Sequence, residues 1–216
     1  MTPERFEKIK HVLNHRQMDL TVIMDNIHKP HNFNAIIRNC DAVGIHQVHY
    51  IPVTQGYRQL NYYAKGSQKW VIAKQQKNIN HIAETLHNKN YQILAAHFSP
   101  KAIDYRQVDY TRKTAIVMGT ELTGISDTTA KLVDQHIIIP MVGMVASLNV
   151  SVANAIILAE AQHQRQQAGM YQTRQMPDKL YQQLLFEWSY PRLARMYRDK
   201  NQAYPPLDEY GYIQKT

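Results

Sequence analysis

Three short clusters of polar residues, far apart in the sequence, contain the side chains best suited to chemistry. Each cluster lies where a predicted strand passes through a loop into a helix, and each places a few polar side chains among apolar ones. The first contains Asn32 and Arg38, the second contains Glu121 between two glycines, and the third contains Ser147 and Asn149. We interpret the three junctions as parts of one composite active site.

Predicted strands and helices alternate between residues 20 and 166. The expected strands cover residues 20–25, 46–52, 70–73, 91–96, 114–118 and 135–139, and the expected helices cover residues 32–43, 79–86, 127–133 and 148–166. This alternation is typical of an α/β fold with a mostly parallel sheet and helices on both faces. Ligands of such sheets bind at the carboxyl ends of the strands, where all three polar clusters lie.

The two ends of the chain differ from its centre. We expect an N-terminal helical extension over residues 1–19, a catalytic domain over 20–168 and a basic C-terminal extension over 169–216, rich in Tyr, Gln, Arg and Pro. The basic residues concentrated at the ends are Arg5, Lys8, Lys10, His11, His15, Arg16, Arg165, Arg174, Lys179, Arg192, Arg195, Arg198 and Lys200. This placement favours a catalytic body whose extensions hold a phosphate backbone.

Composition narrows the class of protein. With 216 residues, 44% of them hydrophobic and 19% charged, the chain is long and apolar enough for a globular core. Its net charge of +8 favours a polyanionic partner, most simply a nucleic acid. The apolar runs are too short to span a bilayer, and no signal peptide is recognisable. The single cysteine, Cys40, excludes an internal disulfide and fits the cytoplasm.

Several common sites find no support in the sequence. A GxGxxG fingerprint, a Walker A loop and a GxSxG motif are all absent, which argues against a Rossmann oxidoreductase, a P-loop NTPase and an α/β hydrolase. His28 and His31 could suggest a metal pair, but Pro30 breaks the helix that would place both rings on one side. We therefore expect no metal.

The ordered trio of motifs resembles the SpoU branch of the SPOUT RNA methyltransferases over roughly residues 20–166. The resemblance rests on N-x5-R from Asn32 to Arg38, on G-x-E-x-x-G at 119–124, and on S-L-N at 147–149 preceded by Ile139-Pro-Met. The flanking helices and the segment QRQQAGMY at 164–171 further resemble the bacterial branch that methylates guanosine 18 in the D-loop of tRNA. Two alternatives stay open: 2′-O-methylation of another tRNA or rRNA nucleotide, and non-catalytic RNA binding by the same fold.

The resemblance implies a cofactor, S-adenosylmethionine, and a deep trefoil knot in the C-terminal part of the sheet, a rare chain topology. Carried over by position, the cofactor pocket comprises Ala96, Gly119, Ile139 and Leu148. Backbone groups there can read the adenine edge, while Ile139 and Leu148 pack on its faces, and Gly119 allows close backbone approach. The alternative for Ile139 and Leu148 is ordinary core packing.

The resemblance also implies roles for the polar residues. A 2′-hydroxyl is a poor nucleophile, and a guanidinium, with a pKa above ~12, is a poor base. We therefore expect Arg38 to clamp a phosphate and stabilise the developing alkoxide, with a surface salt bridge as its alternative. Asn32 would orient Arg38 or the ribose, or cap a helix. Glu121 would hold Asn32 or Arg38 or bind a ribose hydroxyl. Ser147 and Asn149 would hydrogen-bond around the same centre, and Asn149 could also cap a helix.

Two further interactions are expected. Residues 148–160 are apolar on nearly every face, and the resemblance implies a homodimer through this helix and the helix of Asn32, so that Arg38 could serve the partner's site. The alternative is a central helix of a monomer. The tyrosine-rich segment 54–69 and the tail around Tyr190–Arg198 mix aromatic and basic residues, as single-stranded RNA binding favours. The alternatives are a solvated loop and a plain packed helix.

Overall fold

The computed structural model describes residues 1–52, 69–120 and 124–214. Glu121 and the tyrosines of the 54–69 segment therefore lie outside the described residues. The chain divides into two compact units, one formed by Met18–Met170 and the other by Met1–Gln17 together with Tyr171–Thr216. The N- and C-terminal extensions thus belong to one unit.

The larger unit is built on a seven-stranded sheet in the order β3-β2-β1-β6-β4-β7-β5, with every neighbouring pair parallel. The strands are β1 (Leu20–Asp25), β2 (Gln47–Ile51), β3 (Ile72–Gln75), β4 (Gln92–Ala96), β5 (Ile103–Asp104), β6 (Thr114–Met118) and β7 (Gln135–Ile138). The central strands β1 and β6 are buried along their whole length, as expected of parallel strands covered on both faces.

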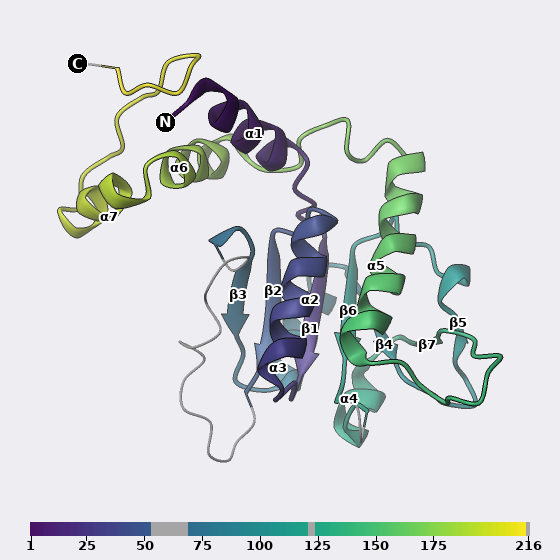
Figure 1. Ribbon diagram of the computed structural model, residues 1–216. Helices are drawn as coiled ribbons and strands as arrows, with labels where there is room; N and C mark the ends of the chain where they lie inside the picture. Colours follow the sequence, from purple (N-terminus) through teal and green to yellow (C-terminus); the bar gives the residue numbers. More distant parts are fainter. Residues whose placement is uncertain (53–68, 121–123, 215–216) are drawn as a thin grey trace. The chain divides into compact units, whose positions relative to one another are not determined.

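Helices cover both faces of this sheet, α2 (Pro30–Ala42) and α5 (Val150–Gln167) on one and α3 (Ile79–His87) and α4 (Asp127–Leu132) on the other. Figure 1 shows α2 and α5 side by side over one face. Alternation along β1 explains the two cores, because Val22 and Met24 pack under α2 and α5 while Ile23 packs under α3. The α/β prediction is confirmed, and the trefoil knot stays a prediction.

The smaller unit is helical. It contains α1 (Pro3–Asn14), α6 (Asp178–Ser189) and α7 (Pro191–Asp199), with α1 packed on α6 and α6 on α7. The Phe186 ring of α6 stacks on Tyr204 with 4.6 Å between ring centroids. The guanidinium of Arg16 is fully buried and lies over the ring of Trp188. Arg16 therefore contributes to packing and not to the basic surface that the sequence suggested.

None of the described helices is long and apolar enough to cross a membrane. Within the same residues, no group of three or more His, Cys, Asp or Glu side chains is arranged to hold a metal ion.

Candidate functional site

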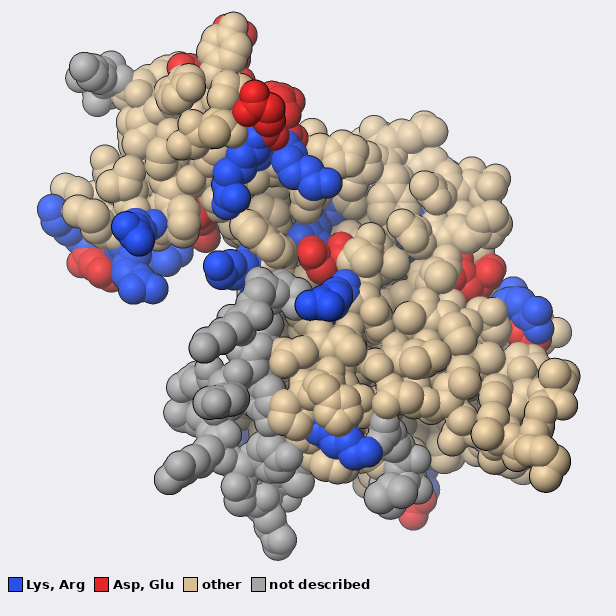
Figure 2. Space-filling view, viewed as in Figure 1, with Lys and Arg blue, Asp and Glu red and all other residues tan. Residues whose placement is uncertain are grey.

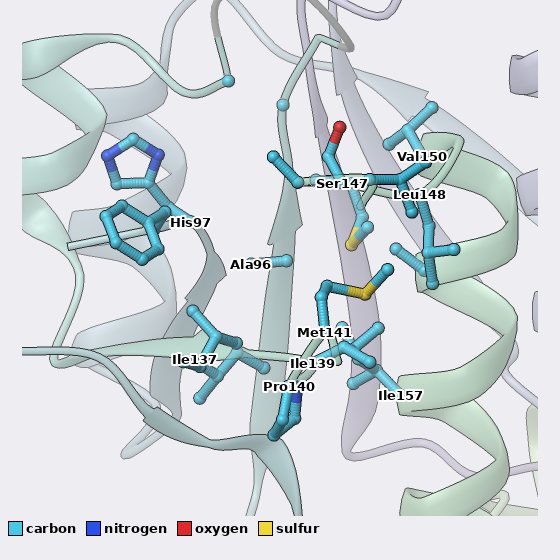
Figure 3. Close-up of a pocket in the computed structure, with 18 of the residues that line it drawn as sticks. Ala96, His97, Ile137, Ile139, Pro140, Met141, Ser147, Leu148, Val150 and Ile157 are labelled. Atoms are coloured by element: carbon cyan, nitrogen blue, oxygen red, sulfur yellow. The ribbon is translucent and has the colours of Figure 1, made fainter. Parts of the chain in front are cut away.

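A large open pocket lies at the carboxyl edge of the sheet in the larger unit. It has a volume of about 1050 Å³ and is lined by residues that follow β4, β6 and β7 and by the start of α5. All four predicted cofactor residues, Ala96, Gly119, Ile139 and Leu148, line it. Figure 3 shows Ile139, Leu148 and Ile157 facing the pocket from three different segments.

The strand order explains why these residues meet. β4 lies between β6 and β7, and all three run in the same direction, so their carboxyl ends share one edge. Ala96 is the last residue of β4 and pairs with Ile137, two residues before Ile139. Gly119 directly follows β6. The four residues carried over from the family resemblance therefore meet at one pocket, at the strand ends where ligands of such sheets bind.

The packing around residue 119 leaves no room for a side chain. A Cβ atom there would lie 2.3 Å from the carbonyl carbon and oxygen of Gly124. The two segments are joined by paired backbone hydrogen bonds between Thr120 and Gly124, of 2.9 and 3.0 Å. Gly124 itself has a φ of +65°, which favours glycine. Two glycines, Gly119 and Gly124, thus allow the backbones on either side of the second motif to pack closely.

The pocket wall is mostly apolar, and its polar side chains are few. Met118 and Ile157 also line it, although the sequence did not mark them, because an isolated Met or Ile is typical of a core, and so does Met141, which was noted only as part of the third motif. Their position next to predicted residues was the available signal: Met118 precedes Gly119, and Met141 follows Ile139 by two residues. Apolar walls of this kind suit the faces of a heteroaromatic ring.

His97 contributes one of the polar groups to the pocket. Burial, followed by the neighbouring His136, lowers its pKa below the usual value, while Asp127 opposes the shift. The two imidazole rings meet edge to face with centroids 5.4 Å apart. At neutral pH His97 is therefore uncharged and can donate or accept a hydrogen bond without placing a cation in the pocket.

Asn32 and Asn149 connect the first and third motifs. Asn149 Nδ2 donates to Asn32 Oδ1 at 3.2 Å, across 117 residues of sequence. Asn149 also caps α5, since its Oδ1 accepts from the backbone N–H of Ser151 at 2.8 Å. The alternative that Asn32 caps α2 is wrong: the helix begins at Pro30, and Asn32 lies inside its first turn with only 2% of its surface exposed.

Arg38 lies on the exposed side of α2. No described acidic side chain lies within salt-bridge distance of it, so the surface salt bridge proposed as its alternative has no partner in the described chain. Its neighbour Asn39 ties α2 to α5 by donating to the Ser151 carbonyl at 2.8 Å. Ser147 is exposed and lines the pocket, whereas the described lining includes neither Arg38 nor Asn32.

One basic residue of the tail motif is structural. Arg165, fully buried near the end of α5, donates to the carbonyls of Tyr110 and Arg112 and pairs with Asp19. It cannot contact a phosphate backbone, contrary to the expectation that grouped it with the surface cations.

A parallel sheet with a glycine-based, apolar pocket at its carboxyl edge defines an α/β protein that binds a cofactor-sized ligand. A model of the SpoU rRNA Methylase family matches residues 19–159, and a model described as "SpoU, rRNA methylase, C-terminal" matches residues 163–216. The chain belongs to the SpoU methylase family.

Individual relatives and solved structures support the same family assignment. The chain is 48% identical to the tRNA (guanosine(18)-2′-O)-methyltransferase of Escherichia coli K12, over 99% of this chain and 94% of that protein. The crystal structure of the Aquifex aeolicus TrmH/SpoU tRNA modifying enzyme superposes with a TM-score of 0.80 at 40% identity, covering 87% of this chain and 96% of that one. An AdoMet-bound rRNA methyltransferase of Sinorhizobium meliloti superposes with a TM-score of 0.61 at 27% identity, over 69% and 58%.

Proposed function

We propose that this protein transfers a methyl group from S-adenosylmethionine to the ribose 2′-hydroxyl of guanosine 18 in the D-loop of tRNA. One observation carries the proposal: the 48% identity to a tRNA (guanosine(18)-2′-O)-methyltransferase extends over 99% of the chain, so it includes the terminal helices as well as the catalytic unit. We place the reaction in the cytoplasm, where unmodified tRNA is available.

The pocket at the carboxyl edge fits S-adenosylmethionine. At about 1050 Å³ it is large enough for a nucleoside with an amino-acid arm. Ile139 and Leu148 would pack on the adenine faces, and the backbone beside Gly119 would approach the ligand closely because any side chain there would strike Gly124. The cofactor supplies an electrophilic methyl group when bound.

The chain's own residues would hold the nucleophile in line with that methyl group. Arg38 would bind the phosphate beside the target ribose and stabilise negative charge as it develops on the 2′-oxygen. Asn32 and Asn149, joined at 3.2 Å, would fix the first turn of α2 against the start of α5 and so set the position of Arg38. Ser147 and Glu121 would hydrogen-bond to the ribose or to these partners.

We propose further that the active form is a homodimer through α2 and α5. An apolar stripe of Val152, Ala155, Ile156 and Ala159 runs along α5 at the spacing of one helix face. Val152 is 46% exposed and Ala159 is exposed as well. A second copy covering this stripe would lie next to α2, so Arg38 would reach the cofactor pocket of that copy.

The terminal extensions would bind tRNA, leaving the chemistry to residues 20–168. Arg192, Arg195 and Lys200 of α7 and its C-cap are exposed, and Figure 2 shows Lys and Arg side chains gathered where Figure 1 draws α7. Arg198 also pairs with Glu187 at 2.9 Å. Cations on one helix suit the regularly spaced phosphates of RNA.

The direct test is methylation of an unmodified tRNA transcript with labelled cofactor, followed by mapping of alkali-resistant linkages. We expect one resistant bond, after guanosine 18, and none in a matched transcript with adenosine at that position. Label at another nucleotide, or in rRNA alone, would replace the proposed site with the alternative within the family. No label, together with no heat on titrating cofactor in a calorimeter, would indicate a non-catalytic RNA-binding protein.

A further inference from the structure

A second, smaller cavity lies in the larger unit, on the face of the sheet that α3 covers. It has a volume of about 200 Å³ and is lined by residues of β1, β2, β3 and α3, none of which lines the cofactor pocket. The pairing register of β1, β2 and β3 explains which side chains line this cavity. His49 of β2 pairs with both Ile23 of β1 and Lys74 of β3, which places these three side chains on the same face of the sheet.

The charges around this cavity are of one sign. Its lining includes two lysines, Lys74 and Lys89, and three histidines, His46, His49 and His81. No described carboxylate lines it. Both lysines are exposed, and neither forms an ion pair with a described residue. Amide and hydroxyl groups share the rest of the wall with apolar side chains such as those of Ile82 and Leu86, and among the amides Gln76 is only 6% exposed.

An acidic residue that affects this cavity, Asp19, is already paired. Asp19 raises the pKa of the lining residue Tyr91, after burial, but Arg165 pairs with that carboxylate and opposes the shift. The phenol of Tyr91 is itself engaged, donating to the Met18 carbonyl at 3.1 Å. Nothing described in the wall therefore balances the positive charge of Lys74 and Lys89.

The pKa of the buried His49 imidazole responds to the charges of these two lysines. Its Nε2 lies 3.2 Å from Gln47 Nε2 and its Nδ1 lies 2.9 Å from Gln76 Nε2, and the neutral ring accepts from one of these two amides. Burial, and then the charges of Lys74 and Lys89, lowers its pKa to about 4. At neutral pH the ring is uncharged, and the two lysines line a cavity that no described carboxylate lines.

We propose that this cavity binds the phosphate group of a phosphorylated ligand, held by the ammonium groups of Lys74 and Lys89 with help from the buried amide of Gln76. A phosphate monoester carries about −1.5 to −2 charges at pH 7, which matches two lysines. At about 200 Å³ the cavity is smaller than the ~300–1,000 Å³ of pockets for whole cofactors, so it fits one oxyanion group and not a nucleoside.

The phosphate could come from the RNA backbone or from a free phosphorylated small molecule. The first source rests on the proposed tRNA substrate and would make the cavity a contact for a part of the tRNA away from the target ribose. The second source requires only the cavity itself. Both groups are phosphate oxyanions, a diester with one negative charge in the RNA backbone and a monoester with about −1.5 to −2 in the free molecule, so the source is decided by experiment.

Titration of the protein with inorganic phosphate, followed by NMR of the His49 imidazole and the Gln76 side-chain amide, tests the site. In the unmodified protein we expect saturable shifts at both groups and a rise in the His49 pKa, because a bound anion offsets the lysine charges. In Lys74→Ala/Lys89→Ala the dissociation constant should rise at least about tenfold. The control Lys101→Ala/Lys131→Ala, which removes two exposed lysines elsewhere on the same unit, should bind phosphate normally.

No saturable response in the unmodified protein, or an equal response in Lys74→Ala/Lys89→Ala, would overturn the site. Both lysines are exposed, so we expect the variant to fold, with unchanged resonances away from the cavity. The test uses no methyl transfer. A failure of the proposed reaction would therefore show in the transcript assay and leave the phosphate result untouched.

Affinity for tRNA across a salt series then identifies the source. If the RNA backbone supplies the phosphate, Lys74→Ala/Lys89→Ala should weaken tRNA binding and lower the slope of log affinity against log salt by about 1 to 2. If a free phosphorylated molecule is the ligand, phosphate binding will be lost in this variant while tRNA affinity and slope stay those of the control. Either result supports the site.

Discussion

The cofactor pocket and the predicted polar cluster of Asn32, Arg38 and Asn149 are built differently. The pocket is formed by backbone turns and apolar side chains of one chain, with Gly119 packed directly against Gly124. The polar cluster mixes a buried amide, an exposed amide and an exposed cation. The difference teaches that the pocket is already a formed cavity in a single chain, whereas the role proposed for Arg38 requires the substrate or a second subunit.

The largest expected effect is a loss of methyl transfer with cofactor affinity unchanged. Arg38→Ala should lower methyl transfer by about 10³-fold or more, because it removes the charge that we propose stabilises the developing alkoxide. Cofactor affinity should stay within about twofold, since Arg38 is outside the described lining of the pocket. Single-turnover transfer and calorimetric titration measure the two quantities.

Arg38→Lys is the matched variant for this test. It keeps the positive charge but loses the planar, bidentate geometry of the guanidinium, so it should recover only part of the lost rate. Turnover of Arg38→Ala close to that of the unmodified enzyme would remove this residue from the mechanism.

The next effect tests whether the polar cluster is completed by a second copy. Val152→Glu places a charge in the apolar stripe of α5 and should produce a monomer at low micromolar concentration, with transfer reduced by about 100-fold. Sedimentation velocity and transfer assays on the same sample measure both effects. Ile72→Glu, at another exposed apolar position of the same unit, is the control.

A dimeric Val152→Glu enzyme, or a fully active monomer, would contradict this account. The first result would place the interface elsewhere. The second would mean that Arg38 acts on the pocket of its own chain.

The cofactor pocket was the part of the site most open to prediction. The family resemblance named Ala96, Gly119, Ile139 and Leu148, and they line one pocket because the parallel strands β4, β6 and β7 bring their carboxyl ends to one edge. The role of Asn149 as a helix cap could also be predicted, because this polar residue directly precedes an apolar helical segment.

Features that depend on register and burial could not be predicted in this way. The third strand, expected at 70–73, occupies Ile72–Gln75, and only this register pairs Lys74 with His49 and makes the cationic cavity. Arg16 and Arg165 are buried although their type suggests the surface. Helix α2 begins at Pro30, two residues earlier than expected, which moves Asn32 into the helix. β5 contains only two residues and has no sequence signal.

A smaller effect should be confined to the cofactor pocket. Gly119→Ala places a methyl group 2.3 Å from the Gly124 backbone, so the turn must shift and cofactor affinity should fall by about 10- to 100-fold. Gly143→Ala is the matched control, because a Cβ there would meet nothing within 4 Å although Gly143 also lines the pocket. Calorimetric titration of both variants compares them, and equal affinities would refute the role of close backbone packing.

The smallest expected effect concerns the bond that joins the two regions. Asn149→Ala removes the cap of α5 and the bond to Asn32, so the free energy of unfolding should fall by about 1 kcal/mol and transfer should slow. Asn149→Asp keeps an oxygen for the Ser151 N–H but cannot donate to Asn32 Oδ1. If the amide bond positions α2, Asn149→Asp will recover the stability but not the rate. Recovery of both in the aspartate variant would show that Asn149 acts only as a cap, and that Arg38 is positioned by other contacts between α2 and α5, such as those of Asn39.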